Sequence, residues 1–322
     1  MNKDVDILKE WNNLFKGDLK ENVLTFDNEI GIGKIEGFCH DERVEILRFN
    51  LEMHQEFPIK GDFFEKTDTY IPIFFKEPDF NTQIDLAHRI ENSEEVKQLV
   101  ENGAFSTNSK DSLNFDFYIN KPVKFISVRL RNDYYQELIN ESETLKKLFS
   151  PNAPFYVFEE FNALLGSAFL RAFAIKQSSS YKVVLMHSVG IHLAAEFFDK
   201  LSQREFLAEE NKYPLSTKSV FQARAILTTR WDKELTIDVL ARECGLSASR
   251  LRTLYKQVFG ITIHQFHNDV KLDVGRTMLL EGDKTISMIG VELGFSSASH
   301  FTTAFKKKYD ITPKEYQNKN KK

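Results

Sequence analysis

The sequence predicts an α+β multidomain protein with a β-rich N-terminal domain that also carries helices, followed by an all-α C-terminal domain. Three observations lead to this prediction. Much of residues 20–131 consists of short segments that alternate apolar and polar residues, as strands do. Residues 218–322 instead show helical periodicity. The same C-terminal part contains an internal repeat of about fifty residues, which indicates a duplicated structural unit.

The N-terminal part is expected to change from strands to helices along the chain. Strands are predicted at 44–53, 69–76, 113–119 and 123–131, and GIGKIEG at 31–37 also has strand-like neighbours. A helix is predicted at 82–102, and helices follow at 133–149, 155–176 and 181–206. The most apolar stretch, Phe155 to Ile175, contains three charged residues, so it is interpreted as a buried helix and not a membrane span.

These patterns predict three segments. Residues 1–206 form a regulatory and dimerisation domain that is β-rich over about 20–131 and helical over about 133–206. Residues 207–217 form a linker, and residues 218–322 form a DNA-binding domain.

The charge is unevenly distributed between the two halves. The net charge is −4, but residues 216–322 hold 18 Lys and Arg against 11 Asp and Glu, whereas residues 1–215 hold 25 against 36. A basic tail behind an acidic front is typical of a protein in which one half contacts DNA. The N-terminus has no apolar segment of the kind a signal peptide needs, and Cys39 and Cys244 lie far apart, so a reducing cytoplasmic location is expected.

The repeat aligns residues 236–266 with residues 285–316. The offset is 49 residues up to a shared glycine, Gly245 or Gly294, and 50 residues after it, so the second turn carries one extra residue. Each copy has a threonine that can cap a short helix, then the glycine, then serines before a second amphipathic helix. This order predicts two helix-turn-helix units, at about 236–259 and 285–309.

Further helices are expected around the two units. A capping box formed by Thr262 and Gln265 begins a central helix that Gly282 ends. A helix over 220–231 precedes the first unit, and Thr312 begins the last helix.

Helical periodicity separates a core stripe from a polar face on the second helix of each unit. The first stripe is Leu251, Leu254, Tyr255 and Val258, and the second is Phe301, Ala304 and Phe305. The predicted DNA-binding residues lie opposite these stripes or at their edges: Ser249, Arg250, Arg252, Thr253, Lys256, Ser299, His300, Thr302, Thr303, Lys306 and Lys307. Arg252 suits a bidentate contact with guanine, whereas the lysines, Lys308 included, suit phosphates.

These motifs resemble the AraC/XylS family of transcription regulators over about the last hundred residues. The resemblance rests on the LA…CGLS…L…YK…FGIT run at 240–262 and the I…GFSS.S.F…FKKKY.ITP..Y run at 286–316. It implies a cupin-like β-barrel followed by dimerising helices, and a central helix that holds two recognition helices for successive major grooves. The chain departs from the usual pattern at several positions: Lys271, Gly275, Gly290, Asp310 and Gln317. Gly275 stands where alanine is more common, which suggests close packing.

The sequence therefore predicts a sequence-specific DNA-binding transcription regulator, controlled by an effector or by dimerisation. The alternative is an architectural DNA-binding protein with little sequence specificity. The expected partners are double-stranded DNA, a small-molecule effector, RNA polymerase and a second copy of the chain, but no membrane. The dimer contact is expected on the 181–206 helix, through Val184, Leu185, Val189, Leu193, Phe197 and Phe198.

An enzyme built on the N-terminal domain is the rival that the sequence does not favour. A cupin metal site needs closely spaced histidines, yet His40, His54 and His88 are isolated. His187 and His192 lie on a predicted helix at a spacing that does not share a face well. GIGKIEG lacks the Lys-Ser/Thr pair of a phosphate-binding loop, and no nucleophile elbow is present. We therefore expect no catalytic residues, no metal and no cofactor.

Overall fold

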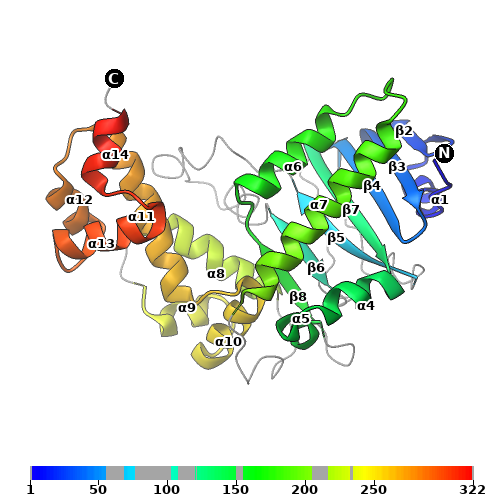
Figure 1. Ribbon diagram of the computed structural model, residues 1–322. Helices are drawn as coiled ribbons and strands as arrows, with labels where there is room; N and C mark the ends of the chain where they lie inside the picture. The colour runs from blue at the N-terminus through cyan, green and yellow to red at the C-terminus, as the bar shows by residue number, and fades with distance from the viewer. Residues whose placement is uncertain are drawn as a thin grey trace. The chain divides into compact units, whose positions relative to one another are not determined.

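The computed structural model describes residues 2–55, 69–76, 103–107, 120, 122–149, 155–204, 217–232 and 235–320 of the chain (Figure 1). The chain divides into two compact units, with the main boundary between Thr217 and Lys218. The segments 82–102 and 113–119, predicted as a helix and a strand, lie outside the described residues. No helix among the described residues is both long and apolar enough to cross a membrane.

The N-terminal unit is built on an antiparallel sheet of eight described strands. They are β1 Asp18–Lys20, β2 Val23–Asp27, β3 Gly31–Asp41, β4 Val44–Met53, β5 Tyr70–Lys76, β6 Ala104–Thr107, β7 Pro122–Arg131 and β8 Tyr156–Glu159. Their order in the sheet is β1-β2-β3-β4-β7-β5-β6-β8. The strands predicted at 44–53, 69–76 and 123–131 are thus confirmed as β4, β5 and β7. Within the described residues β1 and β8 remain the outer strands, so a closed cupin-like barrel is not confirmed.

Helices cover both faces of this sheet. The helices are α1 Ile7–Phe15, α4 Asn132–Asn140, α5 Glu143–Leu148, α6 Ala163–Ala174 and α7 Lys182–Ser202. Figure 1 shows α6 and α7 lying across one face, where Ile46 of β4 joins a buried cluster with Leu193 and Phe197 of α7. Phe49 of the same strand packs edge-on against Trp11 of α1, with ring centroids 5.1 Å apart. Strand alternation thus sends one set of β4 side chains to each layer.

Two predictions for the helical part of this unit need correction. The 155–176 segment is not one helix, because Tyr156–Glu159 pairs with β6 as strand β8 before α6 begins. A short apolar run fits a buried strand as well as a buried helix, which is why periodicity alone did not separate them. The 133–149 segment is two helices, since the Ser142 side chain caps α5 by accepting a hydrogen bond from Leu145 N.

The C-terminal unit consists of seven helices over the described residues. They are α8 Thr217–Thr229, α9 Ile237–Glu243, α10 Ala248–Phe259, α11 Ile263–Glu281, α12 Ile286–Glu292, α13 Ala298–Tyr309 and α14 Pro313–Asn320. The predicted capping box is present, because Thr262 N donates to Gln265 Oε1 at 2.8 Å and Gln265 N donates to Thr262 Oγ1 at 3.1 Å. Gly282 ends α11 in the left-handed conformation, as predicted. The all-helical prediction for this region is confirmed.

Candidate DNA-binding surface

The turn that joins the two helices of each unit begins with the same geometry in both copies. Gly245 and Gly294 adopt φ of 69° and 75°, in the left-handed region that glycine occupies without steric cost. Leu246 N donates to Ala241 O at 2.9 Å, and the second turn contains the equivalent bond at the same length. This pattern satisfies carbonyl groups at the end of α9 and α12. The duplicated sequence therefore folds as a duplicated helix-turn-helix.

The extra residue in the second turn moves the cap of the next helix. In the first unit the Ser247 hydroxyl accepts from Arg250 N at 3.3 Å, two residues after the glycine. In the second unit Ser297 caps α13 by accepting from His300 N at 3.1 Å, three residues after the glycine. The shift of the repeat offset from 49 to 50 residues therefore lies in the turn and leaves both helices intact.

The apolar stripes of α10 and α13 lie in the cores of the two helix-turn-helix units. Leu251, Leu254, Tyr255 and Val258 of α10 are each 0% exposed, and Phe301 and Phe305 of α13 are 0% exposed as well. These values confirm the predicted core faces. The orientation of each helix is fixed by this burial, so the polar face must point away from the core.

The structure places all eleven predicted DNA-binding residues outside the buried core. The exposed ones are Ser249, Arg252, Ser299, His300, Thr303, Lys306 and Lys307. The half-buried ones are Arg250, Thr253, Lys256 and Thr302. Neither α10 nor α13 contains an acidic residue, so nothing on these two helices repels a phosphate backbone. Contact of these residues with DNA stays a prediction.

Lys308 has a structural role that the sequence did not indicate. Its Nζ lies 2.8 Å from Asp273 Oδ2 and donates to Asp269 O at 2.8 Å, while Tyr309 OH donates to Asp273 Oδ1 at 2.6 Å. Both oxygens of Asp273 are thus bound by consecutive side chains of α13, which ties this helix to α11. Lys308 is therefore engaged within the protein, and its contact with a phosphate stays a prediction.

The departure at Gly275 has a steric explanation. A Cβ atom at this position would lie 2.8 Å from Leu293 Cδ1 and 3.1 Å from Phe301 Cε2. Glycine thus lets the middle of α11 approach α12 and α13 closely, as the sequence suggested. Glycine is about 1 kcal/mol less favourable than alanine inside a helix, and the close packing at Gly275 offsets this cost.

The histidines that looked isolated in the sequence are not all isolated in the structure. His40 and His187 lie with ring centroids 5.4 Å apart in the N-terminal unit, although they are far apart in the chain. No group of three or more His, Cys, Asp and Glu side chains in the described part of the chain is arranged to hold a metal ion.

Comparisons with known proteins identify the C-terminal region. Residues 240–319 match a family model described as a helix-turn-helix domain. The chain is 27% identical over 153 residues to the HTH-type transcriptional regulator ArgR of Pseudomonas aeruginosa, covering 48% of this chain and 46% of that protein. It is 33% identical over 106 residues to the xylose operon regulatory protein of Escherichia coli, covering 33% of this chain and 27% of that protein. The chain carries a helix-turn-helix domain of the AraC type.

The likeness to these two relatives covers part of each protein, and the chain spans less than half of the length of both. Among solved structures, an AraC-type transcriptional regulator from Chromobacterium violaceum is 29% identical, with a TM-score of 0.29. That match covers 32% of this chain and 89% of the other chain.

Proposed function

We propose that this chain is a transcription regulator that binds specific sites on double-stranded DNA through α10 and α13. The observation that carries the proposal is the pair of geometrically equivalent helix-turn-helix units whose exposed helix faces are basic and free of acids. In helix-turn-helix proteins the second helix enters the major groove. With two such helices in one chain, we infer that they occupy successive major grooves of one binding site.

The proposed roles of the two classes of side chain differ. Arg252 is exposed at the middle of α10, where its guanidinium can bond O6 and N7 of a guanine together. Lys306 and Lys307 are exposed near the end of α13, which suits phosphate contacts that position the protein without reading sequence. An architectural protein would use contacts of the second class alone.

Replacing Arg252 with alanine is expected to relax specificity at one operator position, at a cost of about 1–3 kcal/mol on the preferred sequence. Replacing Lys307 with alanine should weaken binding to all sequences about equally and reduce the salt slope by about one. Affinities would be measured on a series of single-base operator variants at several salt concentrations. The exposed Lys319, on α14, provides a control whose substitution by alanine should change neither property. Equal behaviour of R252A and K307A on every sequence would favour the architectural alternative.

We also propose that the regulator acts as a homodimer through the N-terminal unit, in the cytoplasm, with RNA polymerase as a further partner. The structure narrows the proposed contact. Val189, Leu193, Phe197 and Phe198 are at most 5% exposed and pack within the unit, so they do not form a free surface. The large apolar residues left exposed on α6, on α7 and beside its first turn are Leu164, Leu170, Tyr181 and Val184. These residues are the revised candidates for contact with a second copy.

The Val184→Glu variant should convert the dimer into a monomer, because the substitution would place a charge in the apolar contact. Light scattering on the full chain at tens of micromolar would give twice the 37.4 kDa chain mass for the unaltered protein. Ala195→Glu adds the same charge to the exposed side of α7, about three turns away, and should leave the dimer intact. A monomeric unaltered protein, or dissociation by both variants, would contradict this contact.

A further inference from the structure

A polar pocket lies in the N-terminal unit, where four segments distant in the sequence converge. The pocket has a volume of about 480 Å³ and is lined by residues of the N-terminal segment, the β3–β4 hairpin, the end of β7 and α7. Small-molecule pockets usually measure about 300–1,000 Å³. The space is therefore adequate for a small metabolite.

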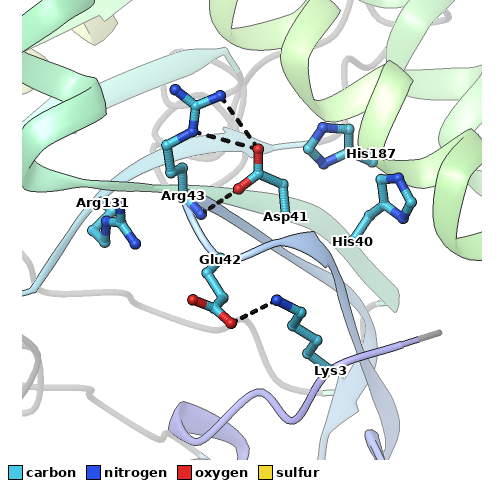
Figure 2. A pocket seen from close by; sticks show the side chains of 7 residues that line it. All are labelled: Lys3, His40, Asp41, Glu42, Arg43, Arg131 and His187. Atoms are coloured by element: carbon cyan, nitrogen blue, oxygen red, sulfur yellow. Dashed lines mark hydrogen bonds and ion pairs between the residues drawn. The ribbon is translucent and has the colours of Figure 1, made fainter.

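The lining decides which chemical class fits this pocket. Figure 2 shows only polar and ionisable side chains around it, so the lining offers an apolar ligand few apolar side chains to pack against. Two lining residues, Asp41 and Glu42, carry carboxylates. The other five side chains are basic: Lys3, His40, Arg43, Arg131 and His187. This excess of basic groups favours a ligand with negative charge.

The existing partners of these cations differ in strength. Lys3 Nζ lies 2.5 Å from Glu42 Oε1, and the Arg131 guanidinium lies 2.7 Å from Asp133 Oδ2, so both form close ion pairs. The Arg43 guanidinium lies 3.3 Å and 3.4 Å from Asp41 Oδ2 and 3.8 Å from a carboxylate of Glu137. These distances exceed the 2.7–2.9 Å that is typical of strong charged bonds, and a guanidinium has five donor hydrogens. Arg43 can therefore donate to a ligand oxygen.

The two histidines add further donors to the lining of the pocket. The register of β3 and β4 shifts between Cys39 and Asp41, and this β-bulge includes His40. Such bulges re-aim a side chain, and here the His40 ring lies edge-on to the His187 ring of α7, 5.4 Å away. His187 Nδ1 is buried and has no hydrogen-bond partner among the described residues. A buried polar atom without a partner is uncommon in folded proteins, and here it means that no hydrogen bond through Nδ1 holds the His187 ring in place.

The charges around His187 are those that a bound anion would change. Burial lowers the pKa of His187 below its usual value of 6.5, His40 and Arg43 lower it further, and Asp41 raises it. The remaining charged groups of the pocket are Lys3, Glu42 and Arg131. An anion between Arg43 and the histidines would offset the repulsion that these groups exert on a charged His187 and would favour its protonated form.

We propose that this pocket binds a small anion with carboxylate or phosphate groups, held by Arg43, His40 and His187. Its role as an effector site rests on the proposed function, whereas the binding itself does not. The pocket lies close to the proposed contact between copies, because His187 is about one helical turn from Val184, a candidate dimer residue on α7. A ligand on His187 would therefore act on the same helix as the proposed contact between copies.

The first test is direct binding of simple anions to the full chain without DNA. Inorganic phosphate and succinate would be titrated by calorimetry at constant ionic strength set with sodium chloride. We expect saturable binding with a Kd of about 1 mM or tighter for at least one anion, and shifts of the His40 and His187 imidazole signals by NMR. The anion that binds more tightly identifies the phosphate or carboxylate class. Absence of saturable binding for both would overturn the proposal and leave the DNA-binding proposal unaffected.

The second test locates the site with matched variants. Arg43→Gln and His187→Gln should each lower the affinity at least tenfold, with far-ultraviolet circular dichroism confirming that both remain folded. Arg171→Gln and His192→Gln are the controls, because both residues are exposed on α6 and α7 and do not line the pocket. Retained affinity in R43Q and H187Q, or equal losses in the controls, would overturn the assignment.

The third test uses sulfate, whose charge stays constant between pH about 8 and 5.5, where histidine titrates. Sulfate affinity should rise by about tenfold over this interval, and His187→Gln should reduce that rise. An affinity independent of pH would overturn the role of the two histidines.

Discussion

The Phe301→Ala variant is expected to lower the free energy of unfolding of the C-terminal unit by about 3–5 kcal/mol, the range for truncation of a buried phenylalanine. Phe301 is 0% exposed, and its ring centroid lies 5.4 Å from Phe295 and 5.7 Å from Phe305. The backbone of α11 and α12 approaches Phe301 closely. A Cβ atom at Gly275 would lie 3.1 Å from Phe301 Cε2, and one at Gly290 would lie 3.2 Å from Phe301 Cβ. The helix backbone at Gly275 and Gly290 limits how far the protein can collapse into the cavity that F301A leaves.

The two tryptophans allow this effect to be assigned to one unit. Trp11 is buried in the N-terminal unit, whereas Trp231 packs against the cluster that contains Phe301. Fluorine NMR of 5-fluorotryptophan-labelled protein in a urea series would follow each unit separately. F301A should shift the Trp231 transition and leave the Trp11 transition in place. Val291→Ala is the control, because Val291 is 69% exposed in the same unit and should change stability by less than about 0.5 kcal/mol. A shift of similar size in V291A would contradict the cavity explanation.

His267 is expected to make the C-terminal unit less stable in acid. Its pKa is lowered to about 4, chiefly by burial and further by Lys271 and His264. Its Nε2 atom is buried without a hydrogen-bond partner in the described part of the chain. In the unfolded chain a histidine titrates near 6.5. Between these two values the unfolded state binds more protons, so stability falls as the pH falls.

The loss of stability between pH about 7 and 5 should be about 1 kcal/mol, because His267 is only half-buried and solvent screens part of the effect that lowers its pKa. The Trp231 fluorine signal again reports it, because Trp231 forms a backbone hydrogen bond with His267. His267→Gln should flatten the pH dependence, whereas His264→Gln, at an exposed position on the same helix, should retain it. If H267Q keeps the full acid loss, another group is responsible.

Most of the C-terminal unit was predictable because its signals are local. The threonine and serine caps act on amides three residues ahead, and Gly245 and Gly294 act within one turn of their own helices. The repeat added support, because the same capping and glycine signals occur at equivalent positions in both copies. Helical periodicity alone also identified the buried faces of α10 and α13 and so the outward position of the predicted DNA-binding residues.

Where the structure departs from the sequence prediction, the cause is a partner that lies far away along the chain. Apolar residues of α7 were assigned to a dimer contact, but Val189 and Leu193 are buried against α7's own unit. Lys308 was expected to contact phosphate only, but its side chain also pairs with Asp273, which lies 35 residues earlier in the chain. In both cases the sequence showed the chemistry of the side chains. It did not show which part of the protein packs against them.

By itself, the sequence determined the helices of the C-terminal unit, their caps, both glycine turns and the division into a strand-rich front and a helical tail. These features depend on interactions between residues a few positions apart, whose chemistry can be read along the chain. Only the tertiary structure decided that β8 joins the sheet, that Asp273 holds α13, and that His40 meets His187 beside Arg43. Such contacts depend on strand register and on which helix packs on which face, and these are set by burial summed over many distant residues.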